Sequence, residues 1–324
     1  MSSLKKAMVI LLSVAMLCGG ATLLQPLPSW ADNNARDYIP APPGIFAILT
    51  YYEHISAQSF YLAGNRATSN LEFTGNVGIL RLIYYGDLPT PFGPIRWAPQ
   101  VLVPFGTTTL DSANLNASGF GNPFILAQFW LYRNDKTKTY FAFTPFFYFN
   151  VGQYNNYKQV LPNAINLGAN RWQFRQELNF TKGFEVIPGH NAYFEVTLGL
   201  DEFTNNTDFG RAGQTLKQNP LLTVESHLSY DITQAVFASI DYYGHYGGSY
   251  KVDPANKAAG FSVGAAGETA LGGSIAYSFA PGFQLMLQYR GDVAVANGPR
   301  ANIFLARFLW ATDTKSLLGN PQAK

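Results

Sequence analysis

The sequence predicts an all-β protein, an antiparallel up-and-down transmembrane β-barrel of about 12 strands. Three observations favour this fold: only 13% of the 324 residues are charged although 47% are hydrophobic, strand-like segments alternate between polar and apolar positions, and long connections alternate with short ones. Soluble domains carry about 25% charged residues, so an ordinary soluble enzyme is disfavoured. The 22 Lys and Arg nearly balance the 20 Asp and Glu, which disfavours nucleic acid as a partner.

Residues 1–31 have the parts of a cleavable signal peptide: a short positive region, an apolar run and small residues at the positions that a signal peptidase reads. We predict cleavage before Asp32, so that residues 32–324 form a single barrel domain with a short C-terminal tail. A retained membrane anchor and a lipoprotein attached through Cys18 are the weaker interpretations. Cys18 is the only cysteine, so the processed chain has no internal disulfide.

Two charge-free windows in the remaining chain, residues 139–157 and 269–289, are long enough to be tested as transmembrane helices. Pro145 and several Asn and Gln residues interrupt the first window, and the turn signal Pro281-Gly282 divides the second. We therefore predict no spanning helix after the signal peptide. A large soluble β protein and a transmembrane barrel remain.

A two-residue period marks the strands, because successive side chains of a strand point to opposite faces. In residues 171–181, Trp172, Phe174 and Leu178 share one face, whereas charged and polar residues occupy the other. The predicted strands, in chain order, are residues 44–56, 69–85, 95–106, 119–133, 138–153, 171–181, 192–201, 220–231, 234–247, 266–280, 283–292 and 301–310.

The connections between these strands alternate in length. The long ones are residues 57–68, 107–118, 154–170, 204–219 and 248–265, and compact turns rich in Gly, Pro, Asn or Asp separate them. Only the last connection, residues 296–300, is short where a long one is due. Bacterial outer-membrane barrels have tight periplasmic turns and long extracellular loops, so this rhythm favours a barrel over a sandwich.

Charged residues on the polar faces predict a lumen. A Lys or Arg toward the bilayer midplane costs about 2–4 kcal/mol, so we expect the apolar faces to contact lipid and the polar faces to point inward. The candidate residues of the lumen and solute path are Arg171, Arg175, Glu177, Glu195, Asp201, Glu225, His227, Asp241, Arg290 and Asp292. Both signs occur, so these groups either border a modest cavity or satisfy one another in a narrow barrel.

Aromatic residues cluster near the predicted strand ends, where membrane barrels carry interfacial girdles. We assign most of the following residues to such girdles, and a few of them to an aromatic solute path. They are Tyr51, Tyr52, Tyr84, Tyr85, Trp97, Trp130, Phe147, Tyr148, Tyr242, Tyr243, Phe308 and Trp310.

Catalytic motifs are sparse. His54 precedes Ser56, and His227 precedes Ser229, by two residues, so each pair shares a strand face and resembles the start of a nucleophilic site. Chance accounts for both pairs equally well. No His, Cys and Asp cluster has metal-ligand spacing, and we predict neither a cofactor, nor a metal, nor a catalytic residue.

Two segments resemble a known family. Residues 37–44 (DYIPAPPG), leading into 49–56 (LTYYEHIS), and residues 167–174 (LGANRWQF) are similar to motifs of the phenol meta-degradation pathway (MetA-pathway) family. The resemblance implies an outer-membrane transporter-like barrel connected with the uptake of aromatic or other hydrophobic compounds. It implies no catalytic residue.

The leading hypothesis is a passive channel in the bacterial outer membrane, reached through the signal peptide, for small hydrophobic or aromatic solutes. Its expected partners are outer-membrane lipid and lipopolysaccharide, the solute, and the outer-membrane assembly machinery. Two alternatives remain: an outer-membrane lipid hydrolase that uses a His/Ser pair, and a structural barrel whose lumen is closed.

Overall fold

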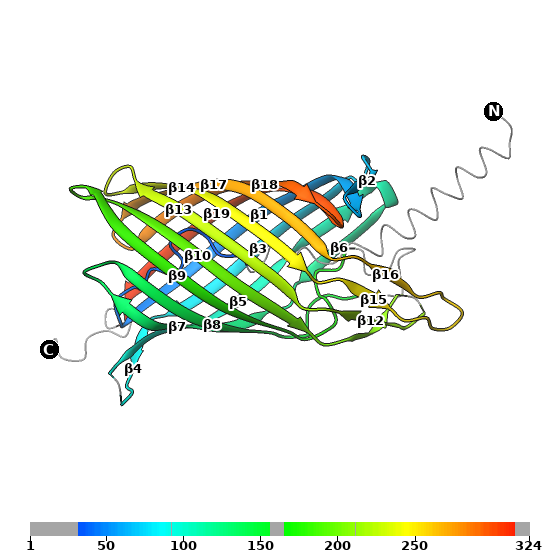
Figure 1. Cartoon of the computed structure of the whole chain (residues 1–324), viewed down its shortest axis with the longest axis horizontal. Coiled ribbons are helices and arrows are strands. Elements are labelled where there is room, and N and C mark those ends of the chain that lie inside the picture. The colour runs from blue at the N-terminus through cyan, green and yellow to red at the C-terminus, as the bar shows by residue number, and fades with distance from the viewer. Residues whose placement is uncertain (1–31, 92, 156–164, 211, 315–324) are drawn as a thin grey trace.

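The computed structural model describes residues 32–91, 93–155, 165–210 and 212–314. Twelve long antiparallel strands form a closed barrel in this part of the chain (Figure 1), which confirms the predicted fold class and strand number. The strands are β1 (Ile45–Leu62), β3 (Phe73–Tyr84), β5 (Ile95–Leu110), β7 (Phe124–Asn134), β8 (Thr139–Tyr148), β9 (Gln173–Ile187), β10 (His190–Phe203), β13 (Leu221–Asp231), β14 (Val236–Gly247), β17 (Ala266–Ala280), β18 (Phe283–Val295) and β19 (Gly298–Asp313).

Each of these strands pairs with the next one along the chain, as an up-and-down topology requires. The last strand closes the barrel on the first: Ile45 of β1 lies opposite Asp313 of β19, and the ladder continues to Tyr61 opposite Gly298. A closed ladder leaves no unpaired edge, which is the condition for a sheet to cross a membrane.

The two-residue period separates the faces of the wall. On β9, Arg175 and Glu177 are 1% exposed and point inward, whereas the flanking Phe174 and Leu178 point outward. Large apolar side chains are exposed all around the outside; Leu178, Ile240 and Leu271 are 45%, 67% and 52% exposed. An apolar surface of this extent is one that lipid would cover.

The two ends of the barrel differ (Figure 1). Tight turns, such as residues 188–189 and 281–282, lie at one end, together with the hairpin that contains β4 (Gly86–Leu88). At the other end lie β2 (Asn65–Thr68), β6 (Leu115–Phe120), the 3₁₀ turn Asp111–Ala113, and a small sheet of β11 (Asn206–Phe209), β12 (Gln214–Gln218), β15 (Tyr250–Val252) and β16 (Phe261–Val263). We call these the short-turn end and the loop end.

The segments predicted as long connections between strands contain strand residues of their own. β1 and β5 continue past their predicted ends to Leu62 and Leu110, and short strands occupy much of the remaining loop residues. Conversely, the strand predicted over 138–153 ends at Tyr148. Beyond the bilayer, backbone N–H and C=O groups still need partners, and strand pairing supplies them without the alternation that marks the wall.

No helix among the described residues is long and apolar enough to cross a membrane. The predicted signal peptide lies outside the described residues. So does the tail from residue 315 onward, although β19 extends three residues past Trp310 to Asp313.

Candidate functional site

Residues 32–43, which precede the first strand, lie inside the barrel; we call them the luminal segment. Asn33, Asn34 and Tyr38 are 8%, 4% and 1% exposed. The segment leaves the interior at Gly44, whose φ of +91° permits the turn into β1. Its N–H donates to the Tyr85 carbonyl at 2.7 Å, so the exit lies against the end of β3.

Asn33 and Tyr38 hold the segment to acidic groups of the wall. Asn33 donates its backbone N–H to Glu225 at 3.0 Å and its side-chain amide to Glu225 at 2.9 Å and Glu177 at 3.1 Å. The Tyr38 hydroxyl donates to Glu177 at 2.6 Å and accepts from the Thr144 hydroxyl, with 3.0 Å between the two oxygens. Hydrogen bonds to carboxylates are stronger than those between neutral groups, so these contacts fix the segment firmly.

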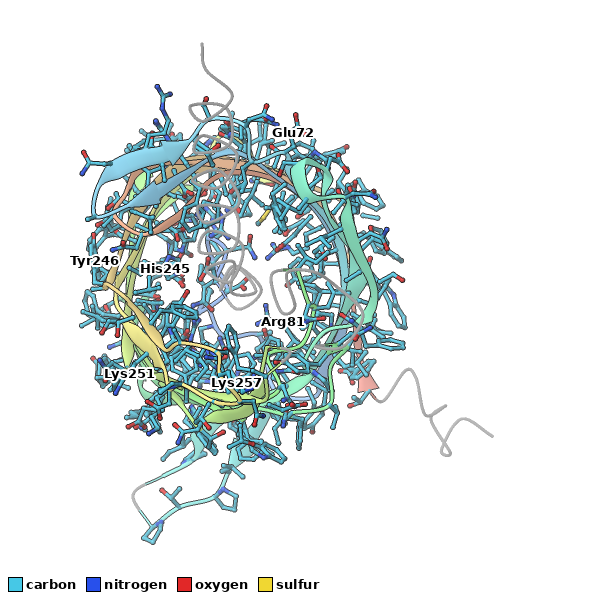
Figure 2. The ribbon with its side chains drawn as sticks, turned by 90° about the vertical axis from the view of Figure 1, so that its right-hand side faces the viewer. Glu72, Arg81, His245, Tyr246, Lys251 and Lys257 are labelled. Carbon is cyan, nitrogen blue, oxygen red and sulfur yellow. The ribbon has the colours of Figure 1, made fainter. Side chains whose placement is uncertain are left out.

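Asp37 lies between two arginines of the wall. One carboxylate oxygen accepts from Arg81 of β3 at 2.9 Å, and the other accepts from Arg307 of β19 at 2.8 Å. Burial alone would raise the pKa of Asp37, but the two guanidinium groups outweigh it and hold the pKa of this carboxyl below its ordinary value. Figure 2, a view along the barrel, shows Arg81 on the inner side of the wall.

Asp32 and Arg36 complete the ionic contacts of the segment. Asp32 pairs with Arg290 at 2.5 Å and with His245 at 3.3 Å. The backbone N–H of Arg36 donates to Glu195 at 2.7 Å, and its guanidinium pairs with Asp231 at 2.6 Å. The segment is thus tied to strands on several sides of the lumen.

The structure places all ten predicted lumen residues inside the barrel, and none is more than 8% exposed. Glu177, Glu195, Glu225 and Arg290 contact the luminal segment.

The other predicted lumen residues contact the wall. Arg175 pairs with Asp201 at 2.8 Å and Glu177 at 3.3 Å, and His227 pairs with Asp241 at 2.9 Å. Arg171 stacks on Phe203 with its guanidinium carbon 4.3 Å from the ring centroid, and Asp292 accepts from the Ala301 N–H at 2.6 Å. The interior charges therefore satisfy one another to a large extent.

Sequence reasoning missed the luminal segment and five buried charged residues in the described part of the wall: Glu53, Arg81, Arg96, His245 and Arg307. For Arg81 a signal existed, because it is a lone charge on a face shared with Val77 and Ile79, and the cost of charge in lipid turns such a face inward. The luminal segment has no period, and nothing in its composition indicates where it lies.

Four of the twelve aromatic residues lie inside the barrel and so belong to no interfacial girdle. Tyr51, Trp130, Tyr148 and Tyr243 are at most 8% exposed and point inward. Trp130 donates its indole N–H to the Tyr38 carbonyl at 2.9 Å, so it anchors the luminal segment. Nearness to a strand end was the wrong criterion, because the parity of a position along its strand decides which face it occupies.

Neither His/Ser pair forms a described His–Ser hydrogen bond. His54 is on the outer face and its Nδ1 bonds Asn76, whereas Ser229 is inside and accepts from Arg36 at 3.0 Å. His227 bonds Asp241 through Nδ1. Among the described residues, no group of three His, Cys, Asp or Glu could hold a metal ion.

The wall carries an apolar groove of about 920 Å³ across β3, β5, β7, β8 and β9. At its floor lies the small side chain of Ala127, opposite Pro99 of β5 and, because Leu126 pairs with Phe146, beside Pro145 of β8. Each proline removes one ladder hydrogen bond from the wall. Outward aromatics such as Tyr84 and Phe174 form its rim.

Inward-facing residues also border this groove. Gln100, Phe146 and Arg175 point into the lumen and line the groove as well. The groove therefore lies over a stretch of wall whose inner face carries these three side chains.

Fold and interior together define a twelve-stranded membrane-type barrel whose lumen holds its own N-terminal segment. The family model described as "Putative MetA-pathway of phenol degradation" matches residues 57–308. The chain belongs to this family, which confirms the resemblance drawn from its sequence motifs.

One of the solved structures that are similar to this chain shows the same fold. An outer membrane channel from Pseudomonas putida F1 is 23% identical, with a TM-score of 0.76 over 87% of this chain and 100% of that one. The transport unit of the autotransporter AIDA-I from Escherichia coli is 9% identical, covering 91% of this chain and 97% of that one, with a TM-score of 0.48. The NanC porin is 8% identical, covering 81% and 98%, with a TM-score of 0.44. No curated protein sequence matches the chain.

Proposed function

We propose that this protein is a passive outer-membrane channel for small hydrophobic or aromatic compounds. The observation that carries the proposal is the apolar groove over Ala127, whose lining combines outward apolar side chains with Phe146 and Arg175, residues of the same wall whose side chains point inward. Family membership and the barrel fold support it. The channel needs no cofactor and no catalytic residue.

In this proposal the solute enters from the loop end, crosses the part of the interior nearest that end and leaves sideways through the groove in the wall. The luminal segment, with its ion pairs to Arg81 and Arg307, makes the axial route through the short-turn end unfavourable for an apolar solute. The stacked rings of Phe124, Phe146 and Tyr148, with centroids 4.5–6.3 Å apart, offer an apolar surface on the way.

The proposed location is the bacterial outer membrane, with the short-turn end in the periplasm. We also propose that the signal peptide is removed before Asp32, which would leave the processed N-terminus within the lumen. Lipid and lipopolysaccharide would cover the exposed apolar belt, and the outer-membrane assembly machinery would insert the barrel.

Uptake by cells with an intact lipopolysaccharide leaflet tests the proposal, because that leaflet, unlike a simple lipid bilayer, excludes apolar solutes. Cells with and without the protein take up labelled toluene, phenol or a disaccharide, and initial rates are compared. We expect faster uptake of the aromatic compounds and an unchanged rate for the sugar. If cells with the folded barrel in their membrane take up each of the three solutes no faster than cells without it, the protein is not a channel for them.

A further inference from the structure

We propose that a second cavity, at the short-turn end, binds a small organic carboxylate. The cavity has a volume of about 280 Å³ and lies between the luminal segment, the ends of β1, β3 and β19, and the turn at residues 232–235. It is separate from the groove in the wall and adds an ionic binding site to a channel proposed above for apolar solutes.

The charges that line the cavity do not balance. Three arginines, Arg36, Arg81 and Arg307, face two carboxylates, Asp37 and Asp231. Both carboxylates are already engaged: Asp37 accepts from Arg81 and Arg307, and Asp231 accepts from Arg36 and from the backbone and side chain of Asn191. The lining thus has one more arginine than it has carboxylates, and Glu195, which is not part of the lining, accepts from the backbone N–H of Arg36 rather than from its guanidinium. A buried positive charge of this kind favours an anion beside it.

Two arginine donors at the cavity have no described partner. Arg307 is 4% exposed; its Nη1 donates to Asp37 and its Nη2 to Gln284, but its Nε is buried without a hydrogen-bond acceptor. The Nη2 of Arg36 is likewise buried without a hydrogen-bond acceptor. Guanidinium groups match the planar geometry of a carboxylate, so an incoming carboxylate would satisfy the donors that Asp37 and Asp231 leave over.

Rings hold the Arg36 guanidinium in place, since its carbon lies 4.0 Å from the Phe237 ring centroid and 4.9 Å from that of Tyr193. A donor that is already fixed loses little conformational entropy when it binds an anion.

Apolar side chains form much of the remaining lining, beside the polar groups of Thr233, Gln234, Ser278 and Gln284, and favour an anion with an apolar body over a purely inorganic one. Ile39, Leu49, Ile83 and Leu309 line the cavity together with Phe237. Pockets for drug-sized ligands have volumes of about 300–1,000 Å³, so this cavity suits one ring or a short branched chain. The unpartnered arginine donors and the apolar lining together indicate a monocarboxylate with a compact apolar body.

The test uses the full protein in detergent and isothermal titration with three probes: benzoate, the uncharged benzyl alcohol, and inorganic phosphate. We expect benzoate to bind one to one and at least tenfold more tightly than either of the others. Equal affinity for benzyl alcohol would mean that the arginines do not contribute to binding. Equal affinity for phosphate would mean that the apolar side chains do not contribute. Either result overturns the proposal.

Arg307→Gln is expected to weaken benzoate binding at least tenfold. The matched control is Arg66→Gln, since Arg66 is an exposed arginine on β2 at the opposite end. If the control loses as much affinity, or Arg307→Gln loses none, the site is not where we place it.

Because Arg307 also holds Asp37, a second variant leaves every charge intact. Ala235 lies in the turn that lines the cavity, and Ala235→Phe would fill the space while the barrel keeps its heat-dependent gel mobility. Unchanged benzoate affinity in the folded Ala235→Phe protein contradicts the proposal. Binding is measured without transport, so failure here leaves the proposed channel function to its own test.

Discussion

Asn33 donates two hydrogen bonds to the same carboxylate oxygen of Glu225, one from its backbone N–H at 3.0 Å and one from its side chain at 2.9 Å, although 192 residues separate the two. This contact holds the start of the luminal segment against β13, and the ion pairs of Asp37 hold a later part of the segment against β3 and β19. Polar groups of the wall and of the segment are thus satisfied by each other, and the occupied lumen is the feature from which most predictions follow.

Asp37→Asn should loosen the luminal segment. The substitution leaves Arg81 and Arg307 without their shared counter-charge, and breaking a buried ion pair costs about 3–5 kcal/mol. We expect larger and more frequent current steps in planar bilayers. Asp253→Asn is the control, because Asp253 pairs with Lys217 in an exposed loop; a similar rise in this variant would assign the effect to surface charge.

The same contact has a definite pH dependence. Because the pKa of docked Asp37 lies below its ordinary value of 3.8, its stabilisation of the segment is complete above about pH 4 and is lost as the pH falls through the lower pKa. The difference in conductance between the wild type and Asp37→Asn should therefore be constant from pH 7 to 5 and vanish in stronger acid. A difference that already disappears near pH 6 would show that Asp37 is not the group responsible.

Ala127→Trp should block the groove in the wall. The indole would occupy the floor of the groove between Pro99 and Pro145, so uptake of toluene by intact cells should fall to the level without the protein. Ala238→Trp places the same ring on the outer face of β14, away from the groove. Equal uptake by both variants would rule out the sideways exit.

Gly106→Ala should prevent a stable barrel. A Cβ at this position of β5 would lie 2.1 Å from the backbone oxygen of Asn76, whereas one at Gly75 would meet only the side chain of Ile55 at 3.4 Å. We expect Gly106→Ala to lose the heat-dependent gel mobility of a folded barrel and Gly75→Ala to keep it. Retention by both variants would contradict the close strand approach at Gly106.

The wall of the barrel was predictable because every outward side chain within the bilayer contacts lipid and must therefore be largely apolar. The alternation in residues 171–181 and the lone charges on polar faces both follow from that requirement. It also indicated which side Glu177, Glu195 and Glu225 occupy. The same parity applied to Trp130 and Tyr243 would have placed these rings inside.

The luminal segment was beyond prediction because no local rule determines its place. Its position depends on contacts such as Asn33 with Glu225 and Asp37 with Arg307, which join residues 192 and 270 positions apart. Residues 37–44 resemble a family motif, but that resemblance does not indicate where in the barrel the segment lies. The groove likewise depends on Ala127 and two prolines meeting across three strands, which only the register reveals.

The most direct test of an occupied lumen compares single-channel currents of the processed chain with those of a chain that lacks residues 32–43. We expect small or rare current steps for the chain of residues 32–324 and a larger, steady conductance for the shortened one, with both proteins showing the gel mobility of a folded barrel. Indistinguishable currents would contradict it, because they would mean that the luminal segment does not obstruct the interior.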